Sequence, residues 1–315
     1  MKPEHPRAAP RSAAHAPGPR VVAPRLSTSG RAPDAPSAEG MHAELRGLRE
    51  HVASLNAQVR ARTQIAFAEG LLVGRYALAD REEAFAVMRT ASQHANVKLH
   101  QLAAALIVMA PPAPGATHWF PGRTASPAPS LAGLRQGRMN PRNQGEVLSA
   151  ALRRAMQITG ADAGNVQLYE AGILRLERHQ GHSQAFLDYF AFVQEGTSCA
   201  RAAVSDRQVT VRDIATASLF DDETRQVLLD AGYHACHSIP LASAAGVVRG
   251  VLNVHHHAPL ETLDQARLSR FEELRRAVGA WLDWHQRTVV LDALEHLHRT
   301  AAGPGTRREH SSDGG

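Results

Sequence analysis

The chain has 315 residues, of which 43% are hydrophobic and only 5% aromatic, and it carries a net charge of +5 at pH 7. Such a composition suits two modest soluble domains with flexible segments between them. It excludes a membrane-spanning protein, because the longest apolar run, at 102–110, is far shorter than the roughly 20 residues that a bilayer requires.

The amino terminus lacks an apolar secretory segment, and the only two cysteines, Cys199 and Cys236, give no disulfide framework. We therefore expect a cytoplasmic protein. Residues 1–40 are rich in Pro, Ala and Arg and are expected to be disordered, while residues 110–139 form a Pro-rich linker. Trp119 and Phe120 within this linker either dock onto a neighbouring domain or are incidental. The folded parts are then residues 41–109 and 140–291, followed by a flexible tail at 292–315.

Apolar residues between positions 45 and 59 recur in alternating steps of three and four, which is a heptad pattern. These residues are Leu45, Leu48, Val52, Leu55 and Val59. The pattern favours a parallel coiled coil and hence a homodimer. Because the pattern is short, the alternative is a single amphipathic helix that packs inside its own domain.

Further helices follow in the same segment. Asp80 and Glu83 have the spacing of a capping box, so a helix is expected to begin near Arg81, and Asn96 suits the turn that ends it. Gly70 stands inside the preceding helix, where it either lets another helix approach closely or marks an earlier helix end. The last helix carries an apolar stripe at Leu99, Leu102, Ala103, Leu106 and Ile107.

The order of small, apolar and basic positions in residues 65–107 resembles the ANTAR domain of bacterial RNA-binding antiterminators. The matching positions are Ala68, Gly70, Leu71, Leu72, Ala84, Phe85, Arg89, Ala91, Ser92, Asn96, Lys98 and Leu99. The resemblance implies an all-α three-helix bundle, preceded by the coiled-coil helix, that binds stem-loops in leader-transcript RNA as a dimer and prevents termination. Unstacked loop bases are the natural target, because the deep groove of A-form RNA cannot be read. The chain departs from the family at Glu69, where a basic residue is usual.

This resemblance places the RNA contacts at Arg89, Lys98, Ala68, Ser92 and Asn96. Arg89 and Lys98 are expected to point outward as phosphate or loop contacts, and the plain alternative is an ordinary solvated face. The hypothesis requires that neighbouring carboxylates do not occupy these two side chains.

From about residue 143 the apolar pattern changes, and an α+β domain is expected. A helix is predicted at 147–158 and a hairpin from the extended runs NVQLYE and ILRLERH. Helical patterns alternate with further strands at 209–211, 237–241 and 247–254, and a closing helix is predicted at 263–291.

That order, with the stretches GADAGNVQLYE, SCARA, VTVRDIAT and AGYHACHSIPLASAAGVVRGVLNVHHH, resembles the GAF domains of bacterial signalling proteins. The resemblance implies an antiparallel sheet with flanking helices that either holds a small ligand between sheet and helices or serves to dimerise. Thiolates and imidazoles bind metals or haem, and histidine titrates near neutral pH. The candidate ligand-binding residues are therefore Cys199, His234, Cys236, His237 and His255.

The alternative for these residues is structural, with both cysteines in the core and the histidines partly exposed. Their spacing matches no standard zinc motif, so the cofactor stays unknown. No phosphate-binding glycine loop, nucleophile elbow or zinc-protease motif occurs in the sequence. The one enzymatic alternative is a GAF-type sulfoxide reductase that uses Cys199 and Cys236.

We therefore expect a cytoplasmic, non-enzymatic regulator in which the GAF-like half senses a small ligand or redox state and the ANTAR-like half binds leader RNA as a dimer. The second hypothesis is a signalling scaffold that acts by protein contacts without binding RNA. The two differ in salt dependence, because binding through phosphates weakens steeply as salt is added.

Overall fold

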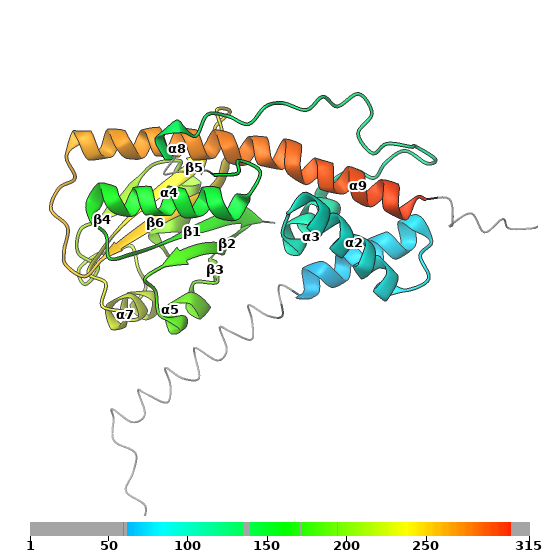
Figure 1. The fold of residues 1–315 in the computed structure, drawn as a ribbon. Helices are drawn as coiled ribbons and strands as arrows, with labels where there is room; N and C mark the ends of the chain where they lie inside the picture. The colour runs from blue at the N-terminus through cyan, green and yellow to red at the C-terminus, as the bar shows by residue number, and fades with distance from the viewer. Residues whose placement is uncertain (1–58, 60–61, 135–138, 171, 194, 304–315) are drawn as a thin grey trace, which may run out of the picture. The chain divides into compact units, whose positions relative to one another are not determined.

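The computed structural model describes residues 59, 62–134, 139–170, 172–193 and 195–303, all of which belong to one compact unit of the chain. The first part is helical, with a helix over residues 62–76 followed by α2 (Arg81–Ala95) and α3 (Leu99–Val108) (Figure 1). We call residues 62–109 the helical half.

The predicted start and end of α2 are confirmed. The Asp80 side chain accepts a hydrogen bond from the backbone N–H of Glu83 (2.8 Å), and the Glu83 carboxylate accepts one from the N–H of Ala79 (2.7 Å). Asn96 ends the helix in the left-handed conformation, with φ 53°, which Asn adopts more readily than most residues. The turn to α3 is therefore short.

The three helices share an apolar core, in which steps of three and four residues place the buried side chains on one stripe of each helix. These side chains are Ala68, Leu72, Ala84, Met88, Ala91, Leu102, Ala103 and Leu106. Gly70 is exposed, and nothing beyond its own helix lies within 4 Å of where a Cβ would stand. The hypothesis that Gly70 lets another described helix approach is therefore wrong, and its helix also continues to residue 76.

The second part, which we call the sheet half, combines strands and helices in the order that the sequence predicts. A short 3-10 turn, η1 (Ala132–Leu134), precedes it. Its elements are α4 (Gln144–Thr159), β1 (Ala163–Glu170), β2 (Ile173–Gln180), α5 (Gln184–Tyr189), β3 (Phe192–Val193), α6 (Ser198–Ser205), β4 (Val209–Val211), α7 (Asp222–Asp230), β5 (Ala235–Ala242), β6 (Val248–His256) and α8 (Gln265–His285).

The six strands form one antiparallel sheet in the order β3-β2-β1-β6-β5-β4. β1 and β2 form the predicted hairpin, in which Glu170 pairs with Ile173 at the turn. The strands predicted at 209–211, 237–241 and 247–254 correspond to β4, β5 and β6. An α+β fold with an antiparallel sheet and flanking helices is thereby confirmed.

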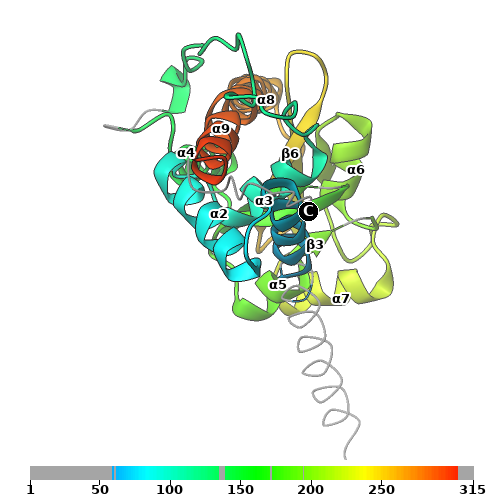
Figure 2. The ribbon, with the colours of Figure 1, turned by 90° about the vertical axis from the view of Figure 1, so that its right-hand side faces the viewer.

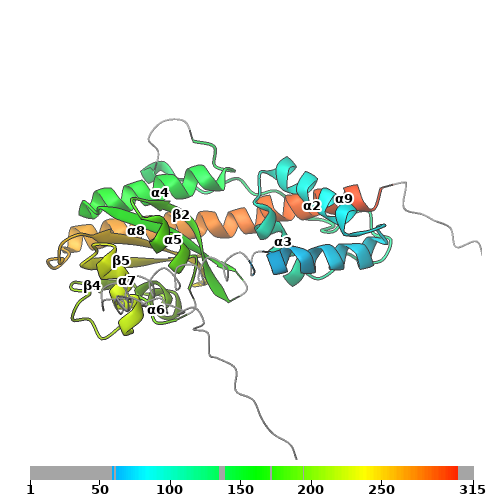
Figure 3. The same ribbon diagram turned by 90° about the horizontal axis from the view of Figure 1, so that it is seen from below.

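Helices cover both faces of this sheet. α4 and α8 pack on one face, and α5, α6 and α7 lie on the other (Figures 1 and 3). Side chains of a strand alternate between the faces, so Ile239 and Leu241 of β5 join the core under α4 and α8, whereas Cys236 joins the core under α5 to α7. This alternation decides which candidate residues can meet.

The closing helix extends further than the sequence predicts. α8 continues through a five-residue π turn, η2 (Gln286–Val290), into α9 (Leu291–Ala301), and Figure 2 looks along this run. The expected flexible tail from residue 292 is therefore wrong over residues 292–301. α9 buries Ala293, Leu294 and Leu297 and packs against α2, and such distant contacts leave no local signal in the sequence.

The Pro-rich linker packs on the protein through its aromatic residues, as the docking alternative requires. Trp119 is only 5% exposed, its backbone N–H donates to the Glu295 carboxylate (2.8 Å), and Arg75 lies over its ring. Further along, the Trp284 indole donates to the carbonyl of Ser126 (2.8 Å). Among the described residues, no helix combines the length and apolar sequence needed to cross a membrane.

Candidate functional site

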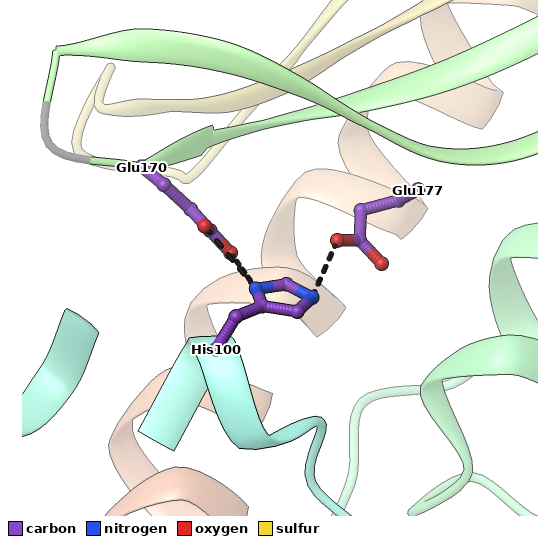
Figure 4. A group of neighbouring side chains, drawn as sticks. All are labelled: His100, Glu170 and Glu177. Atoms are coloured by element: carbon purple, nitrogen blue, oxygen red, sulfur yellow. Dashed lines mark hydrogen bonds and ion pairs between the residues drawn. The ribbon is translucent and has the colours of Figure 1, made fainter. Parts of the chain in front are cut away.

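A cluster of charged side chains joins α3 to the β1–β2 hairpin. His100, in the first turn of α3, lies between two carboxylates, with Nδ1 2.9 Å from Glu170 and Nε2 3.1 Å from Glu177 (Figure 4). The Lys98 ammonium, at the N-cap of α3, contacts the other oxygen of Glu177. Arg175 lies 4.0 Å from Glu170 and 3.8 Å from Glu177. We call these five residues the interdomain cluster.

Burial strengthens the electrostatic interactions among the side chains of this cluster. The Glu177 side chain is only 1% exposed, and burial alone would raise its pKa, but the hydrogen bond from His100 and the charges of His100 and Lys98 lower the pKa below 4.5. Burial likewise opposes the charged form of His100, yet Glu170 and Glu177 outweigh it and raise the pKa of His100 above 6.5. The geometry therefore favours a protonated His100 between two ionised glutamates.

His100, Glu170 and Glu177 could also hold a metal ion, since one ligand atom of each lies within 4.8 Å of the others. Lys98 and Arg175 already supply positive charge to the same carboxylates, however. A divalent cation would have to compete with both side chains and displace the proton of His100. The residues present fit an ion-pair network better than a metal centre.

The two basic residues expected to contact RNA have different environments. Arg89 is exposed on α2, and its guanidinium lies 6.0 Å from the ring centre of Phe85. Lys98 is 38% exposed at its side chain, but it is paired with Glu177. Among the described residues no carboxylate pairs with Arg89, whereas Lys98 does not meet the requirement that neighbouring carboxylates leave it free.

The other three expected RNA contacts have structural roles in this conformation. Ala68 is fully buried, so it cannot touch a ligand, and its expected RNA contact is corrected to a core position. The Ser92 hydroxyl donates to the carbonyl of Val97 (2.6 Å), and Asn96 provides the left-handed turn. Their small size and turn geometry, rather than RNA contacts, account for these residue types here.

The coiled-coil hypothesis lies mostly outside the described residues, which include neither Leu45, Leu48, Val52 nor Leu55. Val59 is described and its side chain is 61% exposed. Thr63 and Gly70, four and eleven residues further on, are also exposed. The dimer stays a prediction.

Three of the five candidate ligand groups lie under α5 to α7. Cys199 and Cys236 belong to the core on that face, and His255 pairs with Cys236 across β5 and β6. The His255 ring lies 5.4 Å from the Phe186 ring, and its Nδ1 has no hydrogen-bond partner among the residues that the structure describes. The structure therefore brings Cys199, Cys236 and His255 to one side of the sheet.

His237 and His234 do not join that group. His237 follows Cys236 along β5, so it points to the opposite face, where its ring stacks on Phe271 of α8. Both ring nitrogens of His237 have partners, Thr210 at 2.8 Å and Gln208 at 3.1 Å. His234 is exposed. Of the five candidates, only Cys199, Cys236 and His255 can therefore share a site.

Two domain models match the chain, in the order that the fold suggests. Residues 53–107 match the ANTAR domain, and residues 144–281 match the GAF domain. The chain carries an ANTAR domain followed by a GAF domain. ANTAR domains are the RNA-binding modules of antiterminators and GAF domains are sensor modules, so the chain is a regulator of this kind.

Several solved structures are similar to the GAF part, and no curated protein matches the chain. The GAF domain/HD domain protein from Geobacter sulfurreducens is 12% identical over 45% of this chain and 92% of its own (TM-score 0.39). The GAF domain from Acinetobacter phosphoenolpyruvate-protein phosphotransferase is 15% identical over 44% of this chain and 80% of its own (TM-score 0.36). The type II free methionine-R-sulfoxide reductase from Thermoplasma acidophilum is 12% identical over 42% of this chain and 87% of its own (TM-score 0.34).

Within the ANTAR domain, the unusual Glu69 has a partner of its own. Its carboxylate accepts hydrogen bonds from Nε (2.9 Å) and a terminal nitrogen (2.6 Å) of Arg81, and Glu69 is only 8% exposed. A neutralised, buried carboxylate does not present a like charge to an RNA backbone. Glu69 is therefore weak evidence against RNA binding.

The GAF domain also has buried polar groups that the sequence analysis missed. The Asn253 amide donates to Asn165 (2.8 Å), and the Gln167 amide donates to the carbonyl of Phe190 (3.1 Å), all under α5 to α7. His182 lies 2.9 Å from the Tyr233 hydroxyl. Asn165 and Gln167 alternate with apolar residues in β1, a pattern that normally indicates that the polar side faces solvent. The pattern therefore does not reveal that helices cover these two side chains.

The two GAF cysteines are poor nucleophiles in this structure. Burial raises the pKa of Cys199 to about 11, although Thr197 lies 3.0 Å from its sulfur, and burial raises the pKa of Cys236 to about 12. The reactive species of a cysteine is the thiolate, which is scarce at neutral pH for such groups. At neutral pH, burial therefore favours the protonated thiol at both positions in this structure.

Proposed function

We propose that this chain is a signal-responsive transcription antitermination regulator in which the GAF domain controls RNA binding by the ANTAR domain. The ANTAR domain binds stem-loops in leader RNA, and the GAF domain responds to a small ligand. The ANTAR part then comprises residues 41–109 with α9 packed against it, and the GAF part comprises residues 140–291.

The contact between Lys98 and Glu177 is the observation that carries this proposal. Lys98 comes from the ANTAR domain and is one of its two basic candidates for RNA contact, whereas Glu177 comes from a GAF strand. A lysine that is paired with a buried carboxylate is not available to a phosphate. RNA binding through Lys98 therefore requires this pair to open, and any event that moves the β1–β2 hairpin alters the RNA-binding surface.

A ligand under α5 to α7 could produce such a movement. Within the described part of the chain, Asn253 Oδ1 and His255 Nδ1 are buried there without hydrogen-bond partners, and unpaired buried polar atoms are costly. Asn165 and Gln167 of the same polar group belong to β1, the strand that pairs with β2 and its Glu177. A small ligand with hydrogen-bonding groups fits this site better than a redox signal at Cys199 and Cys236.

Dimerisation through the heptad residues would place two ANTAR domains on paired stem-loops. Two linked contacts bind more tightly than one, because the second becomes intramolecular. The next heptad positions after the exposed Val59 are Arg62, which is exposed, and Ala66, which is half-buried, so the face is partly open in the described helix. Sedimentation of the full chain measures the oligomeric state.

RNA binding by the full chain to its own upstream leader RNA tests the proposal, with salt varied between 50 and 200 mM. Arg89→Ala is expected to weaken binding about fivefold and to reduce the salt slope by about one, as for one lost phosphate contact. Glu177→Gln removes the charge that holds Lys98 and is expected to strengthen binding several-fold. Glu272→Gln, which breaks pairs with Arg275 and Arg276 within α8, is the matched control.

Absence of binding to this RNA below micromolar protein, in both the wild type and Glu177→Gln, contradicts antitermination by RNA contact. Binding that barely responds to salt and to Arg89→Ala points instead to a scaffold that works through apolar protein contacts. Equal affinity of the wild type and Glu177→Gln contradicts control through the interdomain cluster.

A further inference from the structure

A cavity of about 790 Å³ lies between the ANTAR and GAF domains, and Glu170 and Arg175 of the interdomain cluster are among the residues that line it. Its ANTAR wall comes from the helix over residues 62–76 and from α3. Its GAF wall comes from the adjoining ends of β1 and β2, from β3 and β6, and from the end of α8 with η2. Small-molecule sites in proteins commonly have volumes of roughly 300–1,000 Å³.

Exposed apolar side chains gather at this cavity. Six large apolar side chains are exposed among the described residues, and four of them line it. These four are Val59, Phe67, Val108 and Tyr169, with exposed fractions of 61%, 58%, 70% and 46%. Leaving such surface in water is unfavourable, and a concentration of it at one concave place indicates a binding site.

Three residues that line the same cavity carry buried polar atoms without partners. Among the described residues, Gln101 Oε1, Arg249 Nε and His285 Nε2 are buried and have no hydrogen-bond partner. His285 as a whole is only 2% exposed, and burial lowers its pKa to about 4, so it is neutral at pH 7. When a ligand turns these side chains toward the cavity, the three atoms supply one acceptor, one donor and one nitrogen that can serve as either.

The charges around the cavity are already balanced. The Arg249 guanidinium donates to Asp283 (2.7 Å), and Arg175 lies near Glu170 and Glu177. A charged ligand would have to break these pairs, whereas a neutral one would not. The cavity is therefore suited to a neutral molecule with a large apolar surface and a few hydrogen-bonding groups.

We propose that this cavity is a second ligand site, which binds a neutral, mainly apolar small molecule with ring systems through Gln101, Arg249 and His285. The inference rests on the proposed function in one respect, namely that the contact between the two domains is regulated. Glu170 and Arg175 belong both to the cavity wall and to the interdomain cluster. Occupancy of the cavity therefore acts directly on Glu170, which holds His100, and on Arg175, which lies near Glu177, the partner of Lys98.

Binding of N-phenyl-1-naphthylamine to the full chain tests the site, because this neutral two-ring amine fluoresces when it leaves water. We expect saturable binding of one probe per chain, with a dissociation constant on the order of 10 µM. Ala104→Trp places a large ring in the cavity from α3 and is expected to weaken binding at least tenfold. Ala86→Trp, at a half-buried position of α2 that does not line the cavity, is the control and is expected to bind as the wild type does.

A second variant keeps the test independent of the tryptophan's effect on folding. Gln101→Leu removes the acceptor at similar size and is expected to weaken probe binding about fivefold, the effect of one lost hydrogen bond. Absence of saturable binding, or equal binding by Ala104→Trp and Ala86→Trp, overturns the proposal. So does probe binding that falls as protein concentration and dimer content rise together, since a second copy would then cover the cavity.

The outcome can be separated from that of the proposed function. The probe assay contains no RNA, and the Glu177→Gln effect on RNA binding needs no ligand. Loss of the cavity site with an intact Glu177→Gln effect refutes the second ligand site alone. Probe binding without RNA binding refutes the antiterminator and leaves the cavity standing.

Discussion

The hydroxyl of Tyr76 lies 2.9 Å from Nδ1 of His298, although 222 residues separate them in the chain. Nε2 of the same histidine lies 2.9 Å from the carbonyl oxygen of Ala116 in the linker. His298 therefore connects the end of the first ANTAR helix, the linker and α9. The ANTAR domain is completed by a helix that follows the GAF domain in sequence.

Truncation of a buried α9 leucine is expected to destabilise the protein. Leu297 is fully buried in the core shared with α2, so Leu297→Ala should lower the free energy of unfolding by about 2–5 kcal/mol. Arg299→Ala, at an exposed position of the same helix, should change it by less than about 0.5 kcal/mol. Thermal denaturation measures both, and equal effects would mean that α9 contributes no core.

The stability contributed by the interdomain cluster is expected to decrease both at alkaline and at acidic pH. The pKa of His100 is raised, so its contribution is complete below pH 6.5 and is lost as pH rises through the folded-state value. The pKa of Glu177 is lowered, so its contribution is present above pH 4.5 and is lost as pH falls through the folded-state value.

Comparison with His100→Gln isolates this effect. The difference in melting temperature between the wild type and His100→Gln should be largest between about pH 4.5 and 6.5 and should shrink toward alkaline pH. A difference that grows as pH rises above 7 would show that His100 is neutral in the folded protein.

Two glycine substitutions are expected to change the stability of the protein in opposite directions. Gly70 stands in an exposed helical position with open space, so Gly70→Ala should stabilise the protein by about 1 kcal/mol. A Cβ on Gly279 would lie 1.8 Å from the carbonyl oxygen of Ala242, so Gly279→Ala should destabilise it by about 2 kcal/mol or more. A stable Gly70→Ala variant that no longer dimerises would place Gly70 in the interface between copies.

Cys199 and Cys236 are expected to react slowly with a thiol reagent such as dithionitrobenzoate. Both are buried, and burial raises the pKa of Cys199 to about 11 and that of Cys236 to about 12. The rate should rise by orders of magnitude when the chain is unfolded in guanidinium. Rapid reaction of either thiol in the folded protein would restore the redox and sulfoxide reductase hypotheses.

Local features of the fold could be predicted from the sequence because their causes are local. Asp80, Glu83 and Asn96 mark the ends of α2 through hydrogen bonds over a few residues, and the β1–β2 hairpin follows from its own alternation. The burial of Asn165 could not be predicted, because a polar residue in a strand gives the same pattern whether water or a helix covers it.

The site was harder to predict than the fold, because its geometry depends on distant pairs. Nothing in the sequence around Lys98 or Glu177 indicates that the two meet across 79 residues. The expected cluster of two cysteines and three histidines failed at His237 for a reason that was available, since neighbours in a strand face opposite sides. The position of His234 just before β5, by contrast, could be found only from the structure.

The π turn at Gln286–Val290 has a mechanical consequence. It lies where the continuous helix formed by α8 and α9 leaves the GAF sheet and enters the ANTAR core. A π turn contains about one residue more than a turn of α-helix. Each residue of a regular helix turns the rod by about 100°, so a turn that tightens here would rotate α9 and the leucines it carries against α2. The rotation of α9 about its axis is thus set within these five residues. A change in this turn is a means by which the GAF sheet can move the helices of the ANTAR domain.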